Sequence, residues 1–347
     1  MWTAQPGHQA VPRYRGPSDP GLRCAPLPGV CVNRAFFATV LLHTGLAAVG
    51  CTSKAADSGS SAWVGEPFDS GIPAQTVRVG TFNIEWLTAD PNDGDMRRND
   101  VDHAMIVDLI DSFDPDVLAL QEVEGDTALA HLPLDDHWSW SIGSTGWSQN
   151  VAILWRSDRV SVTNIREITL PHTDGAEKEP HVVEVSAGGF DFTFVGVHHA
   201  AFSDSESSRE RAYQASELVD WLSDTLPDTV SGTAADHIVV AGDYNDTFGG
   251  INSAYPSLEA FTDAGFTFAT SGAAMGTQLS YDSVIDHVAL SPAMADRWSE
   301  ADGCHIEAHD QTSPWSDYEG GYRSTQNISD HRPVWIDLVT TSTESAR

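Results

Sequence analysis

The stretch Ser329-Asp330-His331-Arg332-Pro333-Val334 places an aspartate and a histidine shortly before an apolar run that continues to Val339. Four other polar clusters have the same setting, because each lies at one end of a short apolar run. Carboxylates, carboxamides and imidazoles gathered at strand ends are the side chains that a metal-assisted hydrolase of phosphate esters needs. The four clusters are Asn83 to Glu85, Gln121 and Glu122, Asp243 to Asp246, and Asp286 with His287.

The region around these clusters predicts a domain in which strands outnumber helices. Helical spacing of apolar residues occurs at 98–113, where Asp114-Pro115 should end the helix, and again at 207–226. Because strand, helix and further strands follow in the same order in both halves, we expect two sheets packed face to face with helices outside. The apolar runs that have strand length and composition are 77–82, 117–121, 151–155, 182–185, 190–197, 237–241, 284–290 and 334–339.

The charge balance is strongly acidic, with 50 Asp and Glu against 18 Lys and Arg and a formal net charge of -32. Such a surface repels polyanions at long range and disfavours tight, non-specific nucleic-acid binding, although a local cationic or metal-bearing cleft can still cleave nucleic acid. Only Lys54 and Lys178 are lysines. Arg97-Arg98 and Arg156-Arg159 are the few cationic pairs that could hold a phosphate backbone. The acidic balance also suits a saline medium, where the repulsion is screened.

The longest apolar run, residues 35–50, predicts a leader. It is too short and too interrupted by polar residues to span a membrane, and it resembles the apolar region of a signal peptide. Small residues followed at once by Cys51 resemble a bacterial lipoprotein signal, in which Cys51 becomes lipidated. An ordinary secretory signal and a buried helix are the alternatives. Because the residues before Arg34 are rich in Pro, Gly and Arg without periodicity, we expect the true start near Val32.

These signals divide the chain into four parts. Residues 1–51 form the leader, residues 52–74 a flexible tether rich in Ser, Gly, Ala and Asp, residues 75–340 the folded domain, and residues 341–347 a tail. Three of the four cysteines precede the domain, so Cys304 is alone within it and we expect no structural disulfide there. The leader places the domain outside the cytoplasm, either anchored to a bacterial membrane or secreted.

The ordered set of strand-end clusters resembles the endonuclease/exonuclease/phosphatase superfamily, which includes DNase I-like nucleases, abasic-site endonucleases, neutral sphingomyelinases and inositol-phosphate phosphatases. The resemblance covers nearly all of residues 75–340. It implies an α/β (α+β) fold, a four-layer αββα sandwich with two mostly antiparallel sheets. It also implies phosphoester hydrolysis and a divalent metal, usually Mg²⁺, with Mn²⁺ or Ca²⁺ as alternatives.

The resemblance assigns three carboxylates to the metal. Glu122 matches the principal ligand, Glu85 the acidic residue near the end of the first strand, and Asp330 a metal-side carboxylate. Mg²⁺ prefers hard oxygen ligands and keeps several waters, so one or two carboxylates with a substrate oxygen are enough to hold it.

The resemblance assigns the chemistry to a second set of residues. Asp243 and Asn245 match the pair that orients the attacking water and holds the phosphate. His331 matches the terminal histidine, and Asp286 matches the acid that partners it. With Asp286 at one ring nitrogen, His331 serves either as a general base or as a charged contact to the phosphate.

Further residues match phosphate contacts or supporting positions. Asn83 matches a strand-end asparagine that contacts phosphate. A histidine at the end of the run 190–197 should do the same, and counting along the strand favours His198 over His199. On the following helix, Arg211 and Gln214 match residues with a structural role, and His287 is expected to pack against its neighbours.

Several substrates are compatible with this chemistry. An extracytoplasmic nuclease is the first hypothesis, and a hydrolase of small phosphate esters or phospholipid headgroups is the alternative. A catalytically inactive binding protein on the same fold is the third. The sequence shows no convincing apolar or aromatic loop for a membrane, and an inositol-phosphate enzyme would need clustered Lys and Arg. We expect a monomer without a protein partner.

Overall fold

A computed structural model of the chain describes residues 76–89, 98–172, 178–298, 303–318 and 328–340. All of these residues belong to one unit, which extends from Asp57 to Arg347. The predicted leader with Cys51, the tether and the tail lie outside the described residues.

Two sheets of six strands form the core of the fold. Their strand orders are β11-β12-β1-β2-β4-β3 and β5-β6-β7-β8-β10-β9. The strands are β1 (Thr76–Leu87), β2 (Val117–Val123), β3 (Trp138–Ile142), β4 (Asn150–Arg156), β5 (Ser161–Glu167), β6 (His181–Ala187), β7 (Phe190–His198), β8 (Ile238–Asp243), β9 (Thr267–Phe268), β10 (Asp286–Leu290), β11 (His305–Ile306) and β12 (Val334–Val339).

Each sheet has a single parallel pair at its centre. These pairs are β1 with β2 and β7 with β8, and every other pair of neighbours is antiparallel. The prediction of two mostly antiparallel sheets is therefore confirmed.

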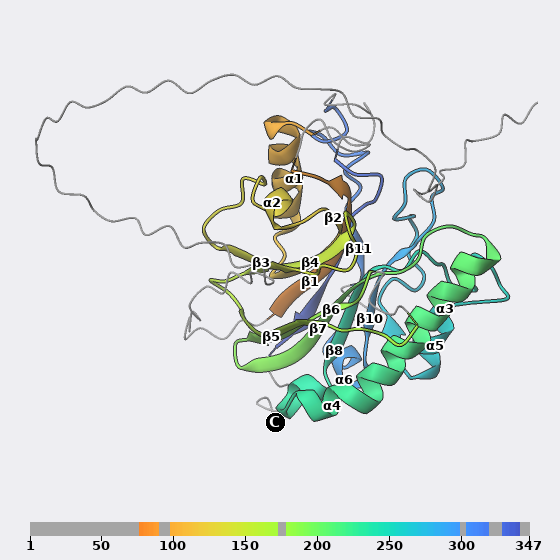
Figure 1. Ribbon diagram of the computed structural model, residues 1–347. Helices are drawn as coiled ribbons and strands as arrows, with labels where there is room; N and C mark the ends of the chain where they lie inside the picture. The colour runs from red at the N-terminus through yellow and green to blue at the C-terminus, as the bar shows by residue number, and fades with distance from the viewer. Residues whose placement is uncertain (1–75, 90–97, 173–177, 299–302, 319–327, 341–347) are drawn as a thin grey trace, which may run out of the picture. The chain divides into compact units, whose positions relative to one another are not determined.

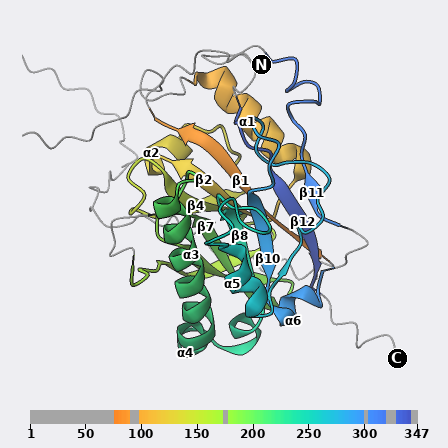
Figure 2. The same ribbon diagram turned by 90° about the vertical axis from the view of Figure 1, so that its right-hand side faces the viewer.

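The layers follow from the alternation of apolar side chains along the strands. One set of alternating residues, such as Val79 of β1 and Val239 of β8, packs between the two sheets. The opposite set faces outward: Phe82 of β1 packs with Ile106 of α1, and Val240 of β8 packs with Leu218 of α3. Helices thus cover both outer faces, with α1 on one side and α3 to α5 on the other (Figure 1, Figure 2). This arrangement is the predicted four-layer αββα sandwich.

The helices are α1 (Asp100–Phe113), α2 (Asp126–Leu129), α3 (Ser205–Asp220), α4 (Leu226–Thr229), α5 (Leu258–Asp263) and α6 (Pro292–Ala295), with a π-helical segment at Trp221–Thr225 and a 3₁₀ turn at Gly232–Ala235. The first predicted helix, 98–113, begins two residues later, because Asn99 caps it by accepting from the backbone N–H groups of Val101 and Asp102. It ends at Asp114, which adopts a left-handed conformation before the proline. Among the described residues, no helix is long and apolar enough to cross a bilayer.

A buried polar contact away from the predicted clusters joins the two sheets. The hydroxyl of Ser141 in β3 and Nε2 of His181 in β6 are 2.8 Å apart, and both side chains are buried. Burial disfavours the charged ring and lowers the pKa of His181 to about 4. His181 is therefore neutral in the folded protein at pH values where it is protonated in the unfolded chain.

We expect the free energy of unfolding to fall as the pH is lowered from about 6.5 to about 4. In this range the unfolded chain protonates His181 and the folded protein does not, so at about pH 5 this group alone costs on the order of 2 kcal/mol. Urea unfolding at about pH 7.5 and about pH 5 measures the effect. His181→Asn should show a smaller loss than the wild type, whereas the exposed His172→Gln should not; an unchanged loss in His181→Asn would contradict the interpretation.

Candidate active site

The parallel pairs bring the predicted clusters together at one edge of the sandwich. The register places Asn83 opposite Gln121 at the ends of β1 and β2, and His198 opposite Asp243 at the ends of β7 and β8. The antiparallel partner β10 begins at Asp286, opposite Asp243. Since β12 runs antiparallel to β1, His331 precedes β12 at the same edge.

Bulges redirect the side chains where β1 and β2 reach this edge. The β1–β2 register shifts between Asn83 and Leu87, and Glu122 lies at a second shift between β2 and β4. Glu85 and Glu122 have φ angles of 50° and 64°, and Asn245 has 49°. Left-handed conformations cost energy for residues other than glycine and often occur at functional sites. The sequence contained no signal for this local geometry.

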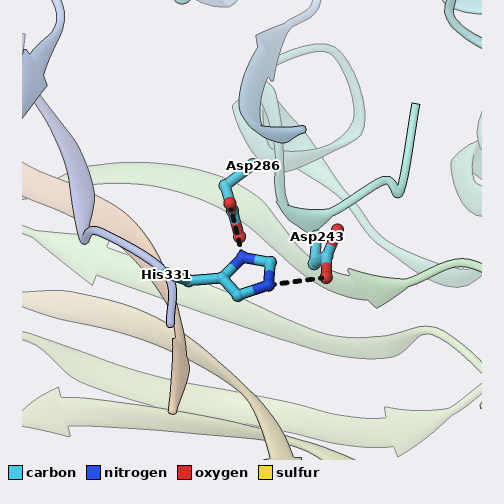
Figure 3. A group of neighbouring side chains, drawn as sticks. All are labelled: Asp243, Asp286 and His331. Atoms are coloured by element: carbon cyan, nitrogen blue, oxygen red, sulfur yellow. Dashed lines mark hydrogen bonds and ion pairs between the residues drawn. The ribbon is translucent and has the colours of Figure 1, made fainter. Parts of the chain in front are cut away.

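His331 lies between two buried aspartates (Figure 3). Its Nδ1 is 2.8 Å from Oδ2 of Asp286, and its Nε2 is 3.9 Å from Oδ2 of Asp243. The hydroxyl of Ser329 accepts from the backbone N–H of His331 and donates to the carbonyl of Asn83, at 3.0 and 2.6 Å. Ser329 thereby links the backbone of His331 to β1 by hydrogen bonds. The expected His331–Asp286 pair is present.

The charges at this group shift two pKa values. Burial opposes the imidazolium, but the carboxylates of Asp286, Asp243 and Asp330 outweigh it and raise the pKa of His331 well above its usual value. Burial, followed by the charge of Asp286, raises the pKa of Asp243 to about 7. A protonated His331 therefore faces an aspartate that titrates near neutral pH.

Asn83 connects the predicted metal ligand Glu122 to the predicted catalytic residue Asp243. Its Nδ2 donates to Oε1 of Glu122 at 3.2 Å and to Oδ2 of Asp243 at 3.0 Å. Its Oδ1 accepts from the backbone N–H of Glu85 at 3.0 Å. Asn245 donates its backbone N–H to Oδ1 of Asp243 at 2.8 Å, so both oxygens of that carboxylate have donors.

The structure brings the ring of His198, rather than that of His199, to these carboxylates. Nε2 of His198 lies 3.8 Å from Oε1 of Glu122 and 3.8 Å from Oδ2 of Asp243. The ring of His199 packs edge-on against Tyr244 with centroids 5.1 Å apart. Burial, followed by the charge of Arg211, lowers the pKa of His199 to about 3. His199 is therefore a neutral, buried residue beside the site.

Sequence reasoning missed Lys178, whose Nζ lies 3.1 Å from Nε2 of His198. Burial, followed by the charges of Lys178 and other neighbours, holds the pKa of His198 well below its usual value. The rarity of lysine in this chain was the only sequence signal that singled out this residue.

The charges of the three predicted metal carboxylates all act on a buried arginine, Arg98. Burial lowers the pKa of Arg98 to about 10. The negative charges of Glu85, Glu122 and Asp330, among others, act in the opposite direction and raise it. The side chains of Glu122 and Asp330 are 14% and 25% exposed, so a small cation can reach their oxygens. These hard oxygen donors fit a divalent ion such as Mg²⁺. Among the described residues, the group with ligand atoms within 4.8 Å of one another is instead Asp243, Asp286 and His331, in which one nitrogen of His331 is already bonded to Asp286.

The structure describes three of the four arginines considered for holding a phosphate backbone. None of the three is placed to do so. Arg98 donates to the carbonyls of Ile84, Glu85, Trp86 and Ile328 and so fastens the chain around the site. Arg156 is the last residue of β4, at the end away from the site, and Arg159 follows it. Arg156 pairs with Asp135 and Asp158, and Arg159 pairs with Asp114 and Asp116. Formal charge could not reveal these partners. Arg97 lies outside the described residues.

The supporting residues occupy the positions expected of them. Arg211 donates to the carbonyls of Ala200 and Phe202, and Gln214 accepts from the N–H of Ala200 at 2.8 Å. Both shape the loop that follows His198. His287 is buried between the hydroxyl of Thr270 and the carbonyl of Asp246, so it packs as expected.

The sequence matches the model of the Endonuclease/Exonuclease/phosphatase family over residues 80–331. The chain belongs to this family. No curated protein matches the sequence closely enough to count as a relative.

Solved structures share the family fold at low sequence identity. The D. rerio TDP2 complexed with single-strand DNA product is 15% identical with a TM-score of 0.54, covering 77% of this chain and 100% of its own. The human Nocturnin catalytic domain with bound sulfate is 17% identical with a TM-score of 0.52, covering 78% and 94%. The mannosyl-6-phosphatase of Bacteroides thetaiotaomicron VPI-5482 is 18% identical with a TM-score of 0.51, covering 76% and 99%.

Three exposed aromatic residues lie on loops at the active-site edge of this family member. Trp147, Phe202 and Tyr281 are 83%, 80% and 81% exposed. The side-chain amide of Asn150, at the start of β4, donates to the carbonyls of Val123 and Trp147 and so ties the Trp147 loop to the end of β2. The exposure of these three side chains could not be predicted from the sequence, because single aromatics between polar residues form no apolar run of the kind expected of a membrane-binding loop.

We expect Asp286→Asn to lower the pKa of His331, because the change removes the carboxylate that contacts Nδ1 and contributes most to stabilising the imidazolium. The measurement is an NMR titration of the imidazole signals, with His331→Gln identifying the resonance. Asp282→Asn, at an exposed carboxylate near Arg332, is the matched control. An unchanged His331 pKa in Asp286→Asn would show that this pair does not stabilise the charged ring.

Proposed function

We propose that the protein is a divalent-metal-dependent phosphodiesterase that acts as a nuclease outside the cytoplasm. The observation that carries the proposal is the position of His331 between Asp286 and Asp243, beside Asn83 and Glu122. A phosphodiester resists attack because its oxygens are negative, so a hydrolase needs both positive charge and a base that activates water. This site contains a group suited to each task.

Glu122, with Glu85 and Asp330, would hold the divalent cation, with Mg²⁺ as the first choice. When bound, such a cation neutralises charge on the phosphoryl oxygens and lowers the pKa of water. Glu122 and Asp330 retain some exposure for this role, whereas Glu85 is buried.

Asp243 is the proposed general base. Its raised pKa of about 7 lies near the operating pH, where a base is most effective. The amide of Asn83 and the backbone N–H of Asn245 orient its two oxygens. His331, protonated because its pKa is raised, contacts a phosphoryl oxygen as an imidazolium. Of the two roles that the sequence left open for His331, this geometry favours the charged contact.

Single-stranded nucleic acid is the proposed substrate. The acidic surface disfavours long, rigid polyanions, whereas Trp147, Phe202 and Tyr281 offer rings on which unpaired bases can stack. The D. rerio TDP2 of similar fold was solved with a single-strand DNA product. Because few cations among the described residues border the site, we propose that binding depends on stacking and on contacts to one phosphate, in a monomer without a protein partner.

The same aromatic residues favour a second candidate, a hydrolase of phospholipid headgroups. Exposed tryptophan, phenylalanine and tyrosine side chains insert readily at a lipid–water interface. An acidic surface is repelled by anionic membranes but not by zwitterionic headgroups such as phosphocholine. Small phosphate esters remain a further alternative for the same chemistry.

We also propose that the protein reaches the outside of the cytoplasm as a lipoprotein or a secreted protein. The apolar run at 35–50 and the small residues before Cys51 support this location. Lipidation at Cys51 would anchor the protein to a membrane through the tether at 52–74.

We expect the wild-type protein to cleave single-stranded DNA in the presence of Mg²⁺, and Glu122→Gln to abolish that cleavage without unfolding the domain. The substitution removes a charged metal ligand and keeps its size. Gel assays of cleavage with a titration of Mg²⁺ measure the effect. Glu124→Gln, whose carboxylate accepts from the N–H of Ala89, is the matched control. Full Mg²⁺-dependent activity in Glu122→Gln would remove Glu122 from the metal site.

We expect Trp147→Ala to raise KM for single-stranded DNA by about 5–100-fold, because stacking contributes about 1–3 kcal/mol per base. The salt dependence of KM should be shallow, since the part of the chain that the structure describes offers few cations to the nucleic-acid backbone. Tyr213→Ala, at an aromatic residue of α3 stacked on His172, is the control. If instead phosphatidylcholine vesicles shift the fluorescence of Trp147 and are hydrolysed while DNA is not, the second candidate replaces the first.

A further inference from the structure

Lysine is almost absent from this chain, yet one lysine borders the candidate active site. Of Lys54 and Lys178, only Lys178 falls within the described residues. Its Nζ lies 3.1 Å from Nε2 of His198. That nitrogen lies 3.8 Å from both Oε1 of Glu122 and Oδ2 of Asp243. The ring of His198 therefore connects the ammonium group to the carboxylates around which the proposed reaction takes place.

The backbone beside Lys178 is held in place by its neighbours on the β5–β6 connection. The N–H of Glu179 donates to the hydroxyl of Thr145 at 2.9 Å, and the buried carboxylate of Glu179 accepts from the N–H of Leu170 at 3.0 Å. The carbonyl of Pro180 accepts from the N–H of Ile168. A side chain that starts from fixed backbone loses less freedom when it binds a ligand.

The contact with Lys178 also determines where His198 carries its proton. An ammonium group has only donors, so Nε2 of His198 must accept and the single ring proton lies on Nδ1. A neutral His198 brings no charge to a substrate. The positive charge at this end of the site comes from Lys178, while His331 supplies it at the other end.

We propose that Lys178 binds a non-bridging oxygen of the substrate phosphoryl group, with His198 holding the ammonium group in place before the substrate arrives. This inference rests on the proposed phosphoester chemistry and extends it to a residue outside the strand ends. Lysine binds phosphate as a compact point charge. The nearby guanidinium of Arg98 donates to four backbone carbonyls instead.

Steady-state kinetics test the contact directly. In Lys178→Met, KM for a short single-stranded DNA and the inhibition constant of inorganic phosphate should rise together by about 10–100-fold, the value of a charged hydrogen bond. The value of kcat should change much less, because the contact exists before and during the reaction. Lys178→Arg should restore most of the phosphate binding. His172→Gln, on the same connection but in contact with Glu217, is the control. A wild-type inhibition constant in Lys178→Met overturns the proposal.

A second measurement needs no turnover. In the full-length chain carrying Lys54→Arg, reductive methylation with ¹³C-formaldehyde labels Lys178 as the only lysine. Inorganic phosphate, added with Mg²⁺, should shift this signal until it saturates, and a signal that stays in place overturns the proposal. If the signal shifts but the wild type cleaves no phosphoester, the proposed function fails while the phosphate contact of Lys178 stands.

Discussion

The parallel pair at the centre of each sheet is the constraint on which the rest of this structure depends. Because β1 runs parallel to β2, and β7 to β8, four carboxyl ends meet at one edge of the sandwich. The antiparallel neighbours β12 and β10 run the opposite way, so their amino ends reach the same edge. Asn83, Asp243 and His331 come from distant parts of the chain and meet because of this pairing. A sheet of hairpins alone would alternate its ends between two edges.

Convergence at this edge buries several carboxylates, and a buried charge without partners costs several kcal/mol. Donors around the site offset that cost. The side-chain amide of Asn83 donates hydrogen bonds to Glu122 and Asp243, and the ring of His331 is hydrogen-bonded to Asp286. The left-handed conformation of Glu122 adds further strain to the same edge. Packing of the three apolar layers must therefore hold together a site that is unfavourable by itself, as in many enzymes.

Much of the fold could be predicted because central strands are buried on both faces and form continuous apolar runs. Four strands were missed, and all of them lie at sheet edges: Trp138–Ile142, Ser161–Glu167 and the two-residue strands Thr267–Phe268 and His305–Ile306. Trp138–Ile142 alternates serine with larger residues, and Ser161–Glu167 is largely polar, because burial at these edges is partial. The helix expected at 207–226 instead begins at Ser205 and passes into a π-helical segment at 221–225. Apolar spacing cannot distinguish these helical forms.

The site could be predicted where a strand end marks the residue, as for Glu122 and His331, but not where burial decides the role. Arg98 and Lys178 are both cations in the sequence, yet one is enclosed by carbonyls and the other borders the carboxylates. The net charge of -32 describes the field far from the protein. Within a screening length of about 8–10 Å, a bound phosphate interacts first with Lys178 and His331. Such a charge distribution repels a long polyanion yet can bind one phosphodiester, so selection for short or unpaired strands can arise from electrostatics without a narrow pocket.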